Sequence, residues 1–129
     1  MIVRTLQNVE ALGRKVDWGN GTSHRYLVAG DGLGFTICRT VCRAGLSTEL
    51  EYRKHLEACV CISGTGWVTV ADGTRHRIEP GTMYALDQHD QHVLTVDGGA
   101  DLLLVSVFSP ALRGDETHDP TRPGASGYE

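Results

Sequence analysis

The sequence has no run of lysine or arginine and no long apolar segment. Its 12 basic residues are outnumbered by 16 acidic ones, leaving a formal net charge of −4. A protein that binds a phosphate backbone needs a basic patch, so nucleic acid is not an expected partner. The first residues mix charges and amides with apolar side chains, unlike a secretory signal. No later stretch has the length of a membrane span. We therefore expect a cytoplasmic protein without a membrane partner.

Cysteine is also scarce, with four in 129 residues. Their spacings are C-x3-C and C-x-C, whereas structural zinc sites commonly use paired C-x2-C motifs. Thiols in the cytosol stay reduced. We therefore interpret Cys38, Cys42, Cys59 and Cys61 as small apolar residues on strand faces.

A long helical pattern is absent, and short apolar runs alternate with glycine-containing turns, which is typical of an all-β sandwich or barrel. Leu6, Val9 and Leu12 have helical spacing before Gly13 and predict one short helix. A D-G turn predicts a hairpin within 66–79. The predicted strands are 23–29, 34–42, 50–52, 56–63, 66–71, 74–79, 82–86, 92–96 and 102–108.

The character of the chain changes near its end. Residues 109–129, "SPALRGDETHDPTRPGASGYE", are polar, rich in proline and glycine, and without periodicity. Such a segment is either disordered or folded over another part of the molecule. We predict one barrel domain over residues 1–110 and a flexible tail over 111–129.

Strand periodicity raises a question about the segment "HLEACVCIS". Period two sends Leu56, Ala58, Val60 and Ile62 to one face and His55, Glu57, Cys59 and Cys61 to the other. Both faces are apolar enough to predict burial. A buried carboxylate is costly, so Glu57 needs a cation, a cluster of donors or a proton.

The stretch "PGTMYALDQHDQH", residues 80–92, carries further candidate ligands. Tyr84 and Leu86 share a strand face, and a short connection would bring Tyr84 close to His92. Together with Glu57 they would form an oxygen and nitrogen ligand set suited to iron or another borderline divalent metal. On spacing alone, packing roles for the glutamate and the histidine are the more common explanation, and both alternatives stay open.

Several motifs resemble the cupin superfamily. Gly45, Glu51, Arg53, Glu57 and Gly64 fall in the register of the first cupin motif, which lacks its two usual histidines here. Tyr84 stands at the spacing of the second-motif histidine. Four blocks, "GLGF", "HLEAC", "PGTMYALDQHDQH" and "FSPALRGDETHD", resemble the ectoine synthase branch in detail. The resemblance spans roughly residues 1–119.

This resemblance implies a cupin-type, jelly-roll-like β-barrel, a head-to-tail homodimer, and an Fe(II) site on Glu57, Tyr84 and His92. It implies a hydro-lyase that closes the ring of N-γ-acetyl-L-2,4-diaminobutyrate with loss of water, giving the compatible solute ectoine. The metal would act as a Lewis acid with open coordination positions.

The resemblance also implies roles for pocket residues. Arg25 is the candidate carboxylate clamp, because its planar fork matches a carboxylate. The other candidate substrate-binding residues are Thr40, Tyr52, Leu86 and Phe108. The candidate catalytic residues are Tyr52, His55, Glu116 and His118, the last two on a tail expected to close over the barrel mouth.

The chain departs from the family at a few positions. Gly21 stands where a tryptophan is common, Glu51 where a histidine is usual, and Cys42, Ser63 and Thr65 where aromatic or charged residues occur. These changes affect the expected pocket wall and leave the candidate metal ligands intact. The alternatives are a cupin enzyme acting on another amide or ring-closing substrate, and a non-catalytic cupin that binds a small molecule.

Overall fold

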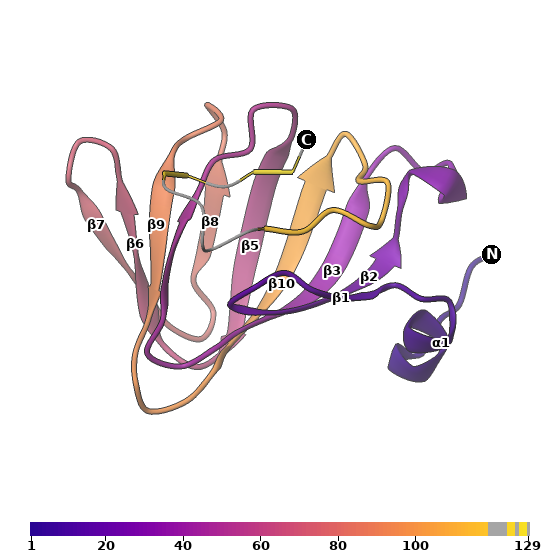
Figure 1. Ribbon diagram of the computed structural model, residues 1–129, viewed down its shortest axis with the longest axis horizontal. Helices are drawn as coiled ribbons and strands as arrows, with labels where there is room; N and C mark the ends of the chain where they lie inside the picture. The colour runs from indigo at the N-terminus through magenta and orange to yellow at the C-terminus, as the bar shows by residue number, and fades with distance from the viewer. Residues whose placement is uncertain (119–123, 126, 129) are drawn as a thin grey trace.

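The computed structural model describes residues 1–118, 124, 125, 127 and 128. Two antiparallel sheets face each other and enclose the core (Figure 1). One sheet has the order β1-β2-β3-β10-β5-β8 and the other β4-β9-β6-β7. The strands are β1 Lys15–Asp17, β2 Gly21–Leu27, β3 Thr36–Cys42, β4 Ser47–Leu50, β5 Leu56–Ser63, β6 Gly66–Val70, β7 Arg75–Ile78, β8 Met83–Leu86, β9 His92–Val96 and β10 Leu102–Ser109. The all-β prediction is confirmed.

Most strand predictions hold to within a few residues. β5 and β9 have the predicted bounds, and β6 and β7 pair as the predicted hairpin, with Gly73 at a φ of 89° in its turn. Two predictions were wrong. The short strand β1 was missed, and the strand predicted at 50–52 lies instead at Ser47–Leu50, where it pairs with β9.

The N-terminal helix α1, Leu6–Ala11, was also predicted correctly. The Thr5 hydroxyl caps it by accepting from the Asn8 amide, and Gly13 ends it at a φ of 74°. Val9 is the helix residue that is fully buried. The helix is tied to β2 because the Glu10 carboxylate lies 2.8 Å from Nε2 of His24. Across the described part of the chain, no helix has the length and hydropathy needed to cross a membrane.

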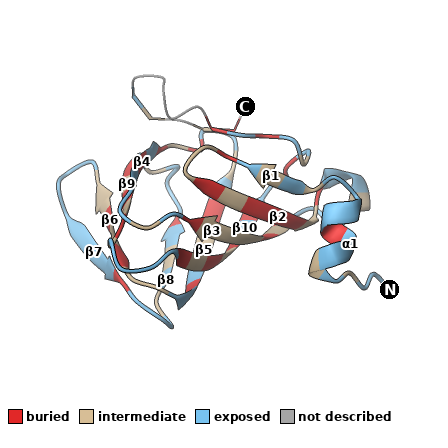
Figure 2. Cartoon of the chain, turned by 60° about the horizontal axis from the view of Figure 1, so that its bottom comes forward, coloured by how far each residue is buried: buried red, intermediate tan, exposed pale blue. Residues whose placement is uncertain are grey.

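The two faces of β5 differ, which corrects the prediction that both are buried. Glu57, Cys59 and Cys61 point into the barrel and are at most 8% exposed. Leu56, Val60 and Ile62 point outward and are about 40 to 50% exposed. Figure 2 shows the same contrast between buried and exposed positions along the strands. The apolar character of the outer face therefore needs an explanation other than the core.

The first part of the predicted tail packs against the barrel. Leu112 is fully buried and its backbone N–H donates to the Thr36 hydroxyl. Glu116 and His118 are each 5% exposed. Of the remaining tail, residues 119–123, 126 and 129 lie outside the described residues.

Candidate functional site

A cavity of about 30 Å³ lies inside the barrel. Its wall combines inward positions of strands from both sheets with the loop before β5 and the C-terminal segment. Six of the residues singled out from the sequence line it: Thr40, Tyr52, Glu57, Tyr84, Phe108 and His118. Alternation along β3, β5, β8 and β10 places Thr40, Glu57, Tyr84 and Phe108 inward, whereas Tyr52 comes from the loop before β5 and His118 from the C-terminal segment.

Glu57 is the most unusual residue of this wall. Its carboxyl is buried, and within the described residues it has no salt-bridge partner. Burial raises its pKa to about 8, and contact with the Cys59 thiol only partly offsets this. Without a cation Glu57 is therefore largely protonated at neutral pH.

Tyr84 lies on the neighbouring strand, where β8 pairs with β5 so that Tyr84 stands opposite Cys59 and Leu86 opposite Glu57. Burial, the adjacent Cys59 thiol and the Glu57 charge raise the pKa of Tyr84 well above its usual value. A tyrosinate at this position requires a positive charge to replace the phenolic proton.

His92 opens β9 in the opposite sheet and is 1% exposed. Its Nδ1–H donates a hydrogen bond to the Asp90 main-chain carbonyl at 2.9 Å. Nε2 is then left as an acceptor, and it is buried without a partner among the described residues. Burial lowers the pKa of His92, so the ring is neutral. A fixed neutral imidazole with one vacant nitrogen is the form that binds metal ions.

The chemistry of these residues suits a divalent metal. His92 offers a buried nitrogen without a partner among the described residues, and Glu57 and Tyr84 offer buried oxygens whose protons a cation would replace. Among the described residues, no group of three or more histidine, cysteine, aspartate or glutamate side chains is placed to hold a metal ion. A site that uses Glu57 and His92 would therefore need Tyr84 as its third side-chain ligand.

Tyr52 and His118 form a hydrogen-bonded pair, with the Tyr52 hydroxyl 2.9 Å from Nε2 of His118. Burial, and then the Glu57 charge, raise the pKa of Tyr52, so its hydroxyl is the donor. Burial lowers the pKa of His118 to about 3, with further contributions from Arg25 and His92. The pair is thus a neutral imidazole accepting from a neutral phenol, which can receive one proton and pass on another.

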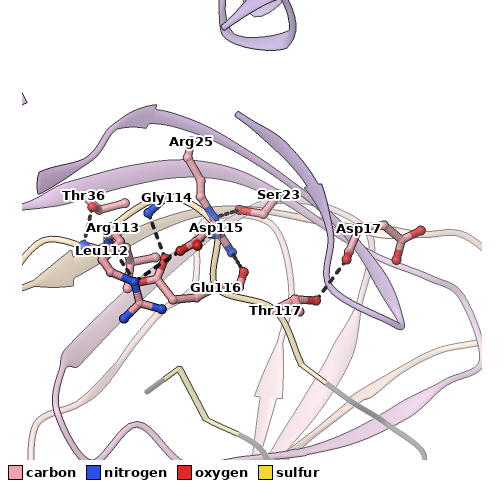
Figure 3. Close-up of polar contacts among 10 residues, drawn as sticks. All are labelled: Asp17, Ser23, Arg25, Thr36, Leu112, Arg113, Gly114, Asp115, Glu116 and Thr117. Carbon is pink, nitrogen blue, oxygen red and sulfur yellow. Dashed lines mark hydrogen bonds and ion pairs between the residues drawn. The ribbon is translucent and has the colours of Figure 1, made fainter. Parts of the chain in front are cut away.

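Arg25 lies on β2 outside the cavity wall and is completely buried. Figure 3 shows its polar contacts to Ser23 and Glu116. One guanidinium nitrogen donates to the Glu116 main-chain carbonyl, and Nε donates to the Ser23 hydroxyl. Nη1 lies 3.5 Å from the Glu116 carboxylate and makes no hydrogen bond within the described residues. This buried cation is therefore incompletely satisfied.

Glu116 faces Arg25 as an anion. Its two carboxylate oxygens accept from the backbone N–H groups of Arg113 and Gly114, both at 2.8 Å. Burial alone would raise the pKa of Glu116, but these backbone donors and the Arg25 charge outweigh it and lower the pKa. A carboxylate held in this way is suited to positioning Arg25 more than to accepting a proton.

Comparison with known proteins identifies the family. The family model for ectoine synthase matches residues 1–125. The chain belongs to the ectoine synthase family. It is 43% identical over 122 residues to the L-ectoine synthase of Wolinella succinogenes, covering 92% of each chain. It is 45% identical over 120 residues to that of Hahella chejuensis, covering 92% of this chain and 89% of the relative.

A solved structure supports the same family assignment. The crystal structure of ectoine synthase from P. lautus superposes with a TM-score of 0.82 at 38% identity, over 88% of this chain and 81% of that one. A cupin 2 conserved barrel domain protein from Salinispora arenicola superposes with a TM-score of 0.67 at 17% identity, over 84% and 88% of the two chains. The latter likeness shows the cupin fold alone. Membership of the ectoine synthase family implies a metal-dependent enzyme.

Not every residue suggested by the family resemblance reaches the cavity wall. Leu86 is buried but lines a separate outer groove between β7 and β8. His55 lies at the strand end, where its Nδ1 is 2.8 Å from the Pro110 carbonyl. Three further candidates, His92, Arg25 and Glu116, do not line the cavity. The His92 ring packs near Tyr52, Arg25 and His92 both affect the pKa of His118, and Arg25 donates to the Glu116 main chain in the tail.

Other residues of the wall were missed from the sequence. Ser23 and Ser106 line the cavity, and Ser106 shares a hydrogen bond with Thr40 at 2.9 Å. Alternation from Arg25 and Phe108 could have found both, since each stands two residues away on the same strand. Tyr128 lies in the tail, where no periodicity pointed to it.

Trp18 packs beside Gly21, the position at which the family resemblance led us to expect a tryptophan. A Cβ at Gly21 would lie 1.8 Å from the Val41 carbonyl oxygen and 2.9 Å from the Trp18 ring, so no side chain fits there. The Trp18 indole lines the cavity, is 4% exposed and meets the His118 ring edge-on at 5.7 Å. An indole is thus supplied from three residues earlier in the chain.

The pKa of Glu57 leads to a testable pH dependence for the metal-free protein. A carboxyl with a pKa of about 8 when folded and 4.5 as its ordinary value holds an extra proton in the folded state between these limits. The free energy of unfolding should therefore fall as pH rises from 4.5 to 8, by at most about 1.4 kcal/mol per pH unit. Urea unfolding of chelator-treated protein at several pH values measures this slope.

The matched control is Glu57→Gln, which keeps the shape and cannot titrate. Its stability should vary less with pH over the same interval. Equal slopes for the two proteins would show that Glu57 is not the group that binds the proton.

Proposed function

We propose that this protein catalyses the cyclisation of N-γ-acetyl-L-2,4-diaminobutyrate to ectoine with loss of water. The observation that carries the proposal is one cavity inside the barrel whose wall holds Glu57 and Tyr84 together with the Tyr52 and His118 pair. The names of the relatives support the same reaction. A cytoplasmic location and a small-molecule substrate follow from this proposal.

Arg25 is the proposed binding site for the substrate carboxylate. It is buried, it carries an unsatisfied N–H on Nη1, and its nearest carboxylate oxygen is at 3.5 Å. A substrate carboxylate can complete these hydrogen bonds with the planar guanidinium. Anchoring this end folds the amine towards the acetamide, and such positioning can lower the activation barrier by up to about 7–11 kcal/mol.

Proton transfer falls to Tyr52 and His118. The α-amine nitrogen forms a bond to the acetamide carbon, and the acetamide oxygen finally leaves as water. Two protons must therefore pass from the ring nitrogens to that oxygen. Neutral His118 accepts a proton from nitrogen, and the Tyr52 hydroxyl bonded to it supplies one to the departing oxygen. The proton on His118 then passes to the Tyr52 oxygen, which restores the pair to move the second proton in the same way. The narrow cavity limits the access of bulk water, which could otherwise hydrolyse the product.

We propose that Glu57, Tyr84 and His92 hold an Fe(II) ion. When bound, this ion supplies a Lewis acid for the acetamide carbonyl. The chain's own contribution is to fix the His92 ring through Asp90 and to present two buried oxygen ligands that are otherwise protonated. The oxygen and nitrogen ligand set suits iron or another borderline divalent metal, and the choice of iron is what the family resemblance implies.

The tail, residues 111–129, is proposed to close the mouth of the barrel. Its described part places Glu116 against Arg25 and His118 against Tyr52. Both contacts join tail side chains to residues proposed to bind or convert the substrate.

The deciding experiment is the cyclisation assay on Fe(II)-loaded protein with N-γ-acetyl-L-2,4-diaminobutyrate. The L-ectoine synthase of Wolinella succinogenes, purified and loaded in the same way, is the control. Formation of ectoine supports the proposal. Absence of cyclic product while the control is active overturns it, and faster turnover of a shorter or longer homologue would reassign the substrate.

We further propose a homodimer, arranged head to tail as the family resemblance implies. The outer face of the adjacent strands β10, β5 and β8 carries an apolar stripe of Leu56, Val60, Ile62, Met83 and Val107, each at least 36% exposed. Contiguous apolar surface of this kind marks protein interfaces.

Light scattering after gel filtration tests the dimer. The wild type should have twice the chain mass, and Val60→Lys combined with Ile62→Lys should yield a monomer. Leu12→Lys, at a 54% exposed position at the end of α1, is the matched control and should remain dimeric. A monomeric wild type would refute the proposal.

A further inference from the structure

Tyr128 contacts four of the residues proposed for the substrate site. Its ring stacks on His118 at a centroid distance of 4.3 Å and lies 5.1 Å from Tyr52 and 5.7 Å from Phe108. The Arg25 guanidinium carbon is 5.1 Å from its centroid. The side chain is 5% exposed and lines the cavity. Tyr128 is thus the residue on which the aromatic and cationic parts of the site converge.

The backbone next to Tyr128 is fitted closely to the barrel. A Cβ added at Gly127 would lie 2.1 Å from the Glu51 carbonyl oxygen. Any residue other than glycine would therefore push the tail away from the loop before β5. Because Tyr52 follows Glu51 directly, this close approach sets the Tyr128 ring against Tyr52.

The space left inside is much smaller than a substrate. A cavity of about 30 Å³ has room for one or two water molecules. Sites that enclose small organic ligands usually measure about 300 Å³ or more. Most of the wall belongs to paired strands, whereas Tyr128 belongs to the C-terminal segment. Trp18, Tyr52 and His118 also line the cavity from outside the strands, but Tyr128 is the one whose ring lies against the Arg25 guanidinium. Its displacement would both enlarge the cavity and expose the proposed carboxylate-binding group.

We propose that Tyr128 is the gate residue of the site: its ring occupies the substrate position in the free enzyme and is displaced when substrate binds. This inference rests on the function proposed above. In the free enzyme the ring covers Arg25, while the Glu116 carboxylate stands near the guanidinium in place of the substrate carboxylate. Binding is weakened by the fraction of molecules in which the gate is shut.

The first test measures the cavity and needs no ligand. Trp18 lines the cavity, and the other tryptophan, Trp67, lies on the β6–β7 hairpin between Arg75 and Arg77. In a Trp67→Phe background, the fluorescence of Trp18 reports whether acrylamide enters. Tyr128→Ala should raise the quenching constant several-fold, whereas Tyr128→Phe keeps the ring and should match the parent protein.

Gly127→Ala is an independent variant, because it retains Tyr128 and removes its seat against Glu51. It should raise quenching as Tyr128→Ala does. Gly98→Ala, at a turn where an added Cβ meets nothing within 4 Å, is the matched control and should leave quenching unchanged. Quenching that is unchanged in Gly127→Ala and Tyr128→Ala, with circular dichroism confirming that both are folded, would overturn the gate.

The second test measures binding of ectoine by titration calorimetry. Removing the gate should tighten binding, so the Kd should fall several-fold for Tyr128→Ala and Gly127→Ala but not for Tyr128→Phe. A higher Kd for Tyr128→Ala would overturn the proposal, since it would make the ring part of the wall around bound ligand. If no variant binds or forms ectoine, the proposed function fails, while the quenching result still decides whether Tyr128 closes the cavity.

Discussion

Replacing Tyr84 with phenylalanine is expected to lower kcat/KM by more than about 100-fold and to reduce the bound metal. Loss of a residue that only supports a metal ligand costs about 10- to 100-fold, and loss of a ligand should exceed this. The substitution removes the phenolic oxygen and keeps the ring. The cyclisation assay and elemental analysis of the same sample measure both effects.

Tyr26→Phe provides the matched control, because that tyrosine lies on β2 outside the cavity wall. It should retain metal and activity. If Tyr84→Phe retained wild-type metal content and turnover, the tyrosine would be a packing residue, and the site would have only two protein ligands among those proposed.

Replacing Arg25 with alanine is expected to cost about 3 kcal/mol of folding free energy in addition to substrate binding. Arg25 is fully buried beside the Glu116 carboxylate, and removing one partner of a buried pair leaves the other charge uncompensated. Chemical unfolding measures the stability change, and the ratio of KM to kcat effects measures the change in binding.

Two further variants separate the causes. Arg25→Ala combined with Glu116→Gln removes the uncompensated charge and should recover part of the lost stability without recovering activity. Arg43→Ala breaks an exposed pair with Asp17 and should cost less than about 1 kcal/mol. An Arg25→Ala protein no less stable than Arg43→Ala would contradict the buried ion pair.

Much of the barrel could be predicted because side-chain alternation and turn residues are local signals. They located β5, β9 and the β6–β7 hairpin, and they placed Glu57 on an inward face. The same signals failed for β4, where Leu50 ends a strand instead of beginning one and Tyr52 lies in a loop that turns into the cavity. A short strand defined by its partner β9 has too little pattern of its own.

The candidate site was only partly accessible to the same reasoning. Family motifs singled out Tyr84, His92 and Arg25, but spacing could not show that Nε2 of His92 is orphaned or that Arg25 is buried. The contacts of Tyr128 depend on a close backbone approach at Gly127, which leaves no trace in hydrophobic periodicity. Long-range packing of an aperiodic segment is a property of the folded chain and not of its local pattern.

The pairing of Trp18 with Gly21 bears on how this enzyme could be engineered. Grafting a tryptophan at position 21 would drive the new ring into the Val41 carbonyl and the existing indole. A working graft would need both positions changed together, with Trp18 reduced to a small residue and the turn between β1 and β2 rebuilt. Residues 18 and 21 thus compete for one volume beside the cavity, so a change at either position has to be designed together with the other.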